Sequence, residues 1–112
     1  MTAGLGSRQY AIIALTLATA VIHLILGFMS EGMFQILFIL NGLGYIGLLV
    51  GLYFLPQLAD KRSMVRYALL LFTAVTLILY FVFNWPDVVN PMGLIDKAIE
   101  LALVILLWMD RA

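Results

Sequence analysis

Three long stretches of this chain, residues 9–30, 32–59 and 67–86, contain no Asp, Glu, Lys or Arg. A helix needs about 20 apolar residues to cross the hydrocarbon core of a bilayer, and each stretch is long enough. Charged residues make up only 11% of the chain and hydrophobic residues 65%, whereas soluble domains usually carry about 25% charged residues. Since a soluble fold of this size could not bury so much apolar surface, we expect lipid to be the solvent for most of it.

Four transmembrane helices are predicted, because a fourth apolar stretch follows Pro91. Pro91 suits the first turn of a helix, and Pro56 suits a helix exit. The turn at 30–32 is so short that the first two helices should form an antiparallel hairpin. We therefore predict an all-α integral membrane protein, an antiparallel bundle that forms a single domain over residues 1–112. The predicted helices are at about 9–29, 33–55, 64–84 and 91–110.

The fourth predicted helix carries three charged residues, Asp96, Lys97 and Glu100. Ionisable groups at membrane depth are costly and are usually paired or functional. Lys97 can neutralise only one of the two acids, so the other needs a further partner or a proton. The simpler interpretation, which we favour, is that Asp96 and Lys97 lie at the interface with Lys97 reaching outward, which leaves only Glu100 buried.

Each predicted helix has one face of small or polar residues when it is read with a period of 3.6. We expect these faces to meet inside the bundle, with the large apolar side chains toward lipid. His23, Asn41 and Thr76 fall at a depth similar to that of the charged residues. A polar network or cavity is thus predicted, open outward and closed by tight packing on the cytoplasmic side. Its candidate residues are His23, Asn41, Thr76, Tyr80, Asp96, Lys97 and Glu100.

Glycines on the second predicted helix also follow helical spacing. Gly44, Gly47 and Gly51 would let another helix approach closely, so we predict helix packing within the bundle at these positions. The alternative is a face for forming a homodimer.

The distribution of Lys and Arg predicts the orientation. Arg8, the segment 61–66 and Arg111 hold the basic residues outside the spans, whereas the other two loops carry only Glu31 and Asp87. Because cytoplasmic loops are enriched in Lys and Arg, we expect a multi-pass protein of the cell membrane with both termini in the cytoplasm.

Two details accompany this orientation. We expect Lys61, Arg62 and Arg66 to contact anionic lipid headgroups. A cleaved signal peptide is the rival interpretation of the N-terminus, but the apolar run continues to Phe28, beyond the 7–15 residues typical of a signal sequence.

His23 is the only histidine of the chain. It could bind haem or a metal, or relay protons with Glu100. Metal sites need three or four ligands, and only Asp96 and Glu100 are suitable companions, so we predict no metal and no cofactor. We expect a structural histidine that is bonded to Asn41 or Glu100.

Several classes of protein are excluded. The chain has no cysteine, which rules out disulfides and iron–sulfur clusters, and its formal net charge of zero does not suggest a nucleic-acid partner. It has no phosphate-binding glycine loop and no nucleophile beside the histidine, so we expect no enzymatic activity.

Short motifs resemble those of a known group. Residues 41–45 (NGLGY), residues 93–101 (GLIDKAIEL) and His23-Leu24 resemble a family of small, uncharacterised four-helix membrane proteins of archaea and some bacteria. That resemblance implies architecture but no activity. In size the chain is also similar to small multidrug-resistance transporters, but their proton-coupling acid lies in the first helix, where this chain has none, so that function is not carried over.

Three functions remain open. We favour a structural or accessory membrane protein with an internal polar network, in contact with the lipid bilayer and with a homodimer or a membrane complex as partner. The alternative is a proton-coupled transporter or channel that acts as a homo-oligomer, with Glu100 as the titrating acid. A haem or pigment carrier that uses His23 is the third.

Overall fold

The computed structural model describes residues 6–85 and 91–110, and this part of the chain is helical without any strand. It contains four long helices, as predicted, and each bound differs from the predicted one by two residues or fewer. A short 3-10 helix that was not predicted follows the second long helix and begins at Pro56. The elements are α1 (Ser7–Met29), α2 (Met33–Tyr53), η2 (Pro56–Lys61), α3 (Arg62–Asn84) and α4 (Pro91–Met109).

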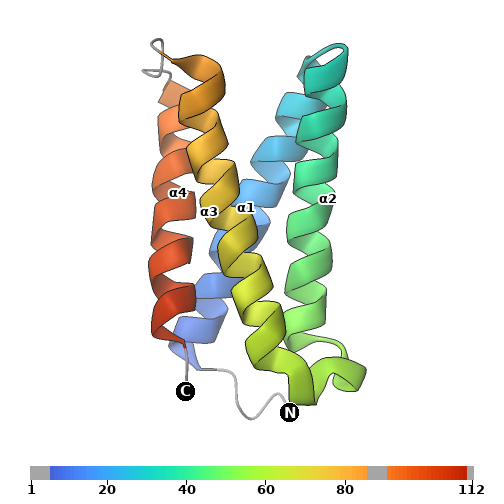
Figure 1. Cartoon of the computed structure of the whole chain (residues 1–112), viewed down its shortest axis with the longest axis vertical. Helices are drawn as coiled ribbons and strands as arrows, with labels where there is room; N and C mark the ends of the chain where they lie inside the picture. The colour runs from blue at the N-terminus through green and yellow to red at the C-terminus, as the bar shows by residue number, and fades with distance from the viewer. Residues whose placement is uncertain (1–5, 86–90, 111–112) are drawn as a thin grey trace.

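The four long helices form an elongated bundle of 43 × 23 × 19 Å (Figure 1). Each helix packs against two others: α1 and α3 both contact α2 and α4, whereas the diagonal pairs α1–α3 and α2–α4 make no backbone contact. The order around the bundle is therefore α1, α2, α3, α4. Figure 1 shows that the α1–α2 pair diverges from the α3–α4 pair toward the end that carries the 30–32 turn.

The turn between α1 and α2 depends on one glycine. Gly32 has φ 68°, the only positive φ among the described residues, and a side chain there would be strained. The backbone N–H of Ser30 donates to the carbonyl of Gly27 and closes the last turn of α1. These two features reverse the chain within three residues, so the predicted antiparallel hairpin is confirmed.

Within residues 6–85 and 91–110, three segments are long and apolar enough to cross a membrane, namely α1, α2 and the segment Pro56–Asn84. The charged residues of α4 set it apart from these three. Many large apolar side chains point outward around the bundle, for example Phe28 (75% exposed), Ile36 (59%) and Leu71 (62%). Soluble monomers rarely expose apolar surface so continuously, so the surface is compatible with a lipid environment.

The inward face of α2 is not the one predicted. Gly42, Tyr45, Leu49 and Leu52 are buried, whereas Gly47 is exposed and a Cβ built there meets no atom within 4 Å. The prediction that Gly47 packs against another helix of the bundle is therefore wrong.

The other two glycines do lie against neighbours. A Cβ at Gly44 would come within 2.6 Å of the Phe72 ring on α3, and one at Gly51 would lie 3.4 Å from Leu58 of η2. Gly42 lies against the backbone of α1, where a Cβ would come within 2.9 Å of the carbonyl oxygen of Ala20. Gly42 thus lets α2 pack against α1, and Gly44 lets α2 pack against α3.

Candidate functional site

The charged residues of α4 all point into the bundle. Asp96, Lys97 and Glu100 are 2%, 6% and 0% exposed. Asp96 and Glu100 lie one helical turn apart, and Lys97 shares their face. The expectation that Asp96 and Lys97 face outward, with Lys97 reaching to the interface, is therefore wrong.

One ammonium group bridges the two carboxylates. Lys97 Nζ lies 3.3 Å from Asp96 Oδ2 and also pairs with Glu100 Oε1. On its other side Nζ lies 5.2 Å from the centroid of the Tyr80 ring on α3, within range of a cation–π contact. The short Lys-to-Glu spacing, i to i+3, lets the side chain fold back along its own helix instead of extending away from it.

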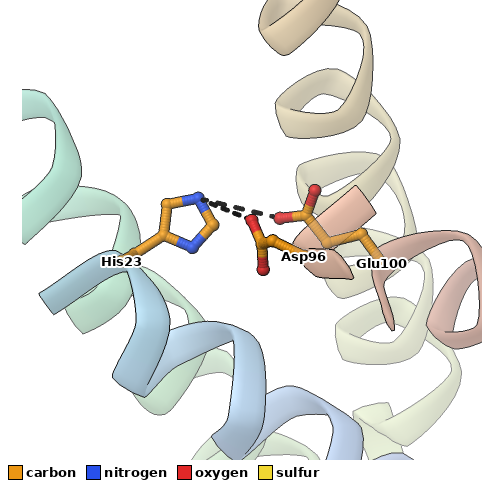
Figure 2. A group of neighbouring side chains, drawn as sticks. All are labelled: His23, Asp96 and Glu100. Atoms are coloured by element: carbon orange, nitrogen blue, oxygen red, sulfur yellow. Dashed lines mark ion pairs between the residues drawn. The ribbon is translucent and has the colours of Figure 1, made fainter. Parts of the chain in front are cut away.

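His23 reaches the same cluster from α1 (Figure 2). Its Nδ1 lies 2.7 Å from the carbonyl oxygen of Thr19, and because a carbonyl oxygen only accepts, Nδ1 must carry the hydrogen. The remaining nitrogen, Nε2, lies 3.6 Å from Asp96 Oδ2 and 3.8 Å from Glu100 Oε2. A ring protonated at Nε2 would therefore form ion pairs with both carboxylates. In a neutral ring, the Nε2 lone pair would face the same two negative charges, which is unfavourable.

Two hydroxyl groups complete the cluster, and sequence reasoning missed both. Thr19 Oγ1 donates to Asp96 Oδ1 at 2.6 Å and also lies 3.1 Å from Glu100 Oε2. Tyr45 donates from α2 to Glu100 Oε2 at 2.8 Å. Thr19 lies four residues before His23 and Tyr45 four residues after Asn41, so helical spacing from these two polar residues could have identified them.

Asn41 makes no hydrogen bond with His23, contrary to one of the two expected pairings of that histidine. Its Nδ2 instead donates to Thr76 Oγ1 at 2.9 Å, and Thr76 Oγ1 donates to the carbonyl of Phe72 at 2.9 Å. The other amide atom, Asn41 Oδ1, is buried and has no hydrogen-bond partner among the described residues. Such an acceptor is costly to leave unpaired in a protein interior.

A cavity of about 340 Å³ opens above the cluster and receives side chains from all four long helices. Because residues next to both the 30–32 turn and the 85–91 connection line it, the cavity lies at the end where the helix pairs diverge (Figure 1). Its polar lining includes His23, Asn41, Thr76, Tyr80, Asp96 and Lys97, and its walls include Phe34, Phe38, Leu79 and Phe83. Six of the seven predicted site residues thus line one cavity, and Glu100 lies beneath it.

The opposite end of the bundle is closed. Apolar side chains fill it, among them Ile12, Leu49, Leu69, Leu103 and Leu107, all at most 3% exposed. Arg66 is buried here, 4% exposed, and donates to the carbonyl of Leu107 at 2.8 Å. The expectation that Arg66 contacts lipid headgroups is therefore wrong.

Donor atoms of His23, Asp96 and Glu100 lie within 4.8 Å of one another, and these residue types can ligate a divalent cation. The Lys97 ammonium, however, already lies against both carboxylates. A metal would have to displace that charge. The geometry is better described as an ion-pair cluster, with two negative charges against one positive when the imidazole is neutral and with no net charge when it is protonated.

The chain belongs to a family of unknown function (DUF7475), whose model matches residues 3–109. The predicted resemblance to an uncharacterised family is confirmed to that extent, whereas a membrane location and an occurrence in archaea and bacteria stay predictions. Comparison with curated proteins gave no match, and comparison with solved structures gave none either.

Proposed function

We propose that this chain is an integral membrane protein of four spans that binds a small ligand in its cavity and links this binding to a proton held by the charged cluster. A transporter or channel built from more than one copy is the form of this function that we favour. No enzymatic activity is part of the proposal.

Burial of the charges supports α4 as the fourth span. Its three charged side chains face the bundle, and its outward residues are apolar, among them Ile95 (55% exposed), Leu101 (51%) and Ile105 (50%). A helix with this division can lie in lipid, because charged groups within a membrane are tolerated when they face the protein interior and are paired.

Orientation follows from the basic residues. The start of α1 and the end of α4 lie at one end of the bundle, where Arg8 Nη1 is 3.8 Å from Asp110 Oδ1. Lys61 and Arg62, at the junction of η2 and α3, belong to the same end. The positive-inside rule favours the cytoplasm for this end, so the cavity would open on the outer side of the cell membrane.

The observation that carries the proposal is that the cavity ends on the charged cluster. A network that served only to hold helices together would be enclosed on all sides, whereas His23, Asp96 and Lys97 line an open space. This arrangement favours ligand binding over the purely structural role that the sequence alone suggested. Internal sites of this kind, with ionisable groups at membrane depth, are typical of ion and proton pathways.

Linkage to a proton follows from the charge of the cluster. Tyr45 from α2 and Asp96 and Glu100 from α4 face His23, while Lys97 pairs with both carboxylates and lies over the Tyr80 ring of α3. With a neutral imidazole the two carboxylates face one ammonium, so one added positive charge balances the cluster. Glu100 is its most buried acid and anchors Lys97, Tyr45 and Thr19.

A haem or pigment carrier is a weaker candidate. Nδ1 of His23 is held by a backbone carbonyl, and Nε2 faces two carboxylates, so neither nitrogen is free to ligate an iron in the cavity.

Proton flux tests the proposal. Protein is reconstituted into vesicles that contain a pH-sensitive dye, and the outside pH is lowered. We expect the wild type to acidify the interior faster than protein-free vesicles do, and Glu100→Gln to remove most of the difference. Glu31→Gln, which removes an exposed acid in the turn, is the matched control and should behave as wild type. A wild-type rate equal to that of empty vesicles would refute proton conduction through the bundle.

A further inference from the structure

We infer that the cavity takes an organic cation, a primary ammonium group on an apolar body, with the ammonium at Asp96 and Asn41 and the body against an aromatic wall. The inference rests on the proposed function in taking the cavity as a ligand site, and it names the chemical class of the ligand.

Charge selects a cation. Asp96 and Lys97 line the cavity, and Glu100 pairs with Lys97 from below. The single ammonium of Lys97 balances one of the two carboxylates, so the cluster has one negative charge left when His23 is neutral. A singly charged cation neutralises this net negative charge, whereas a singly charged anion would double it. Uncompensated charge is costly in a poorly solvated site.

A buried acceptor without a partner, on a residue that lines the cavity, selects a donor. Asn41 Oδ1 is a buried acceptor with no partner among the described residues, and Asn41 lines the cavity. In this arrangement Nδ2 donates to Thr76 Oγ1, whose own hydrogen is given to the Phe72 carbonyl, and Oδ1 is the end of the amide that has no partner among the described residues. A ligand N–H would supply the missing donor. Ammonium groups carry three donors and no acceptor, which matches both Asn41 Oδ1 and the Asp96 carboxylate.

An aromatic wall leads from the cluster toward the cavity mouth. The Phe38 ring lies 6.1 Å from the His23 ring, Phe34 lies 6.2 Å from Phe38, and Phe83 of α3 meets Phe34 edge-on at 6.1 Å. These three phenylalanines line the same cavity as Asp96 and Lys97. Apolar walls with a few placed polar groups are typical of small-molecule sites, and ring faces also attract cations.

The ligand and the proton would exclude each other. The cluster accommodates one additional positive charge, which is either the proton on His23 Nε2 or the bound ammonium. A bound cation therefore disfavours a proton on Nε2, and a proton on Nε2 weakens binding of the cation. A cluster of this kind exchanges the two.

Binding of matched probes tests the inference. The probe is 2-phenylethylammonium, and its comparison compounds are the uncharged 2-phenylethanol, the anion 3-phenylpropionate and the quaternary 2-phenylethyl-trimethylammonium, which has no N–H donor. Affinity is measured by calorimetry on the full chain in detergent micelles at two pH values. We expect the ammonium to bind at least about tenfold more tightly than the alcohol and the quaternary ion, the anion not to bind, and affinity to fall at the lower pH.

Variants locate the site. Asp96→Asn should lower the affinity for 2-phenylethylammonium by about tenfold or more and leave the affinity for 2-phenylethanol unchanged. Asn41→Leu should cancel the preference for the primary over the quaternary ammonium, and Glu31→Gln should change nothing. If Asp96→Asn fails to fold, the affinities of the wild type for the four probes still test whether the cavity takes a primary ammonium.

Equal binding of the alcohol and the ammonium, or tighter binding of the anion, would overturn the inference. If no probe binds while vesicles show proton flux that depends on Glu100, the proposed function stands and the cation assignment falls. If the ammonium binds with the expected selectivity but at the same affinity at both pH values, the cation assignment stands and exchange with a proton falls.

Discussion

Tyr45 and Glu100 are joined by a hydrogen bond of 2.8 Å across the centre of the bundle, although their helices, α2 and α4, make no backbone contact. Tyr45 is fully buried, and its ring also lies 5.8 Å from the His23 ring and 4.8 Å from the Phe72 ring. One side chain thus connects all four long helices at the level of the cluster. This contact separates the cavity above from the apolar packing below.

Removing the Tyr45 hydroxyl should destabilise the fold. In Tyr45→Phe, Glu100 Oε2 loses a donor while the ring packing remains, and we expect the free energy of unfolding to fall by about 0.5–2 kcal/mol, as for other polar contacts between membrane helices. Unfolding in mixed micelles measures this loss. Tyr10→Phe, at an exposed position, is the control, and an equal effect of both substitutions would show that the bond to Glu100 contributes nothing.

Lys97 should be needed for the stability of the fold, because its ammonium pairs with two buried carboxylates. Lys97→Met leaves Asp96 and Glu100 facing each other without the ammonium, and we expect destabilisation of about 3–5 kcal/mol. Adding Glu100→Gln to Lys97→Met removes one of the two acids and should restore much of the lost stability. A double-mutant cycle measures this coupling, with Lys61→Met as the exposed control. Simple additivity of the two substitutions would mean that the pair does not interact.

The metal alternative makes a different prediction. Because Lys97 pairs with both carboxylates, we expect the thermal midpoint of the purified protein to be unchanged by a chelator and by added Zn²⁺ or Mn²⁺. Lys97→Met should open the site and allow a metal-dependent rise. A rise in the wild type would mean that the cation displaces Lys97, and the cluster would then be a metal centre.

Topology can be tested directly because the chain has no cysteine. Single cysteines at Ser7 and at Glu31 lie at opposite ends of α1. In intact cells, we expect an impermeant maleimide to label the cysteine at position 31 and to label the one at position 7 only after lysis. The reverse pattern would place the cavity on the cytoplasmic side.

Much of the fold was predictable because helices in this chain are delimited by charges, prolines and a glycine turn. The inward faces of α1 and α4 were predictable too, since His23 and the charged residues of α4 stand out against apolar surroundings. The face of α2 was not, because α2 is apolar almost all round and its sequence carries no clear inward direction. The small residues of α2 led to the prediction that the face with Gly47 points inward, whereas the face with the bulky Tyr45 does so.

Partners across helices could not be read from sequence. Asn41 bonds to Thr76 and not to His23 because α2 has α3 as its neighbour on that side, and the order of helices around the bundle is a tertiary property. Burial of Arg66 was missed for the same reason. Its guanidinium reaches a carbonyl at the end of α4, which lies 41 residues away in sequence.

Protonation of His23 is the quantity on which the account depends, and the chain contains only this one histidine. Nitrogen-15 NMR of histidine-labelled protein in micelles therefore reports on it without assignment. We predict that Nδ1 carries the hydrogen that the Thr19 carbonyl accepts, and that Asp96→Asn and Glu100→Gln each shift the Nε2 resonance, because each replaces a carboxylate that faces Nε2. An Nε2 resonance that neither substitution shifts, or a hydrogen found on Nε2 and not on Nδ1, would contradict the account.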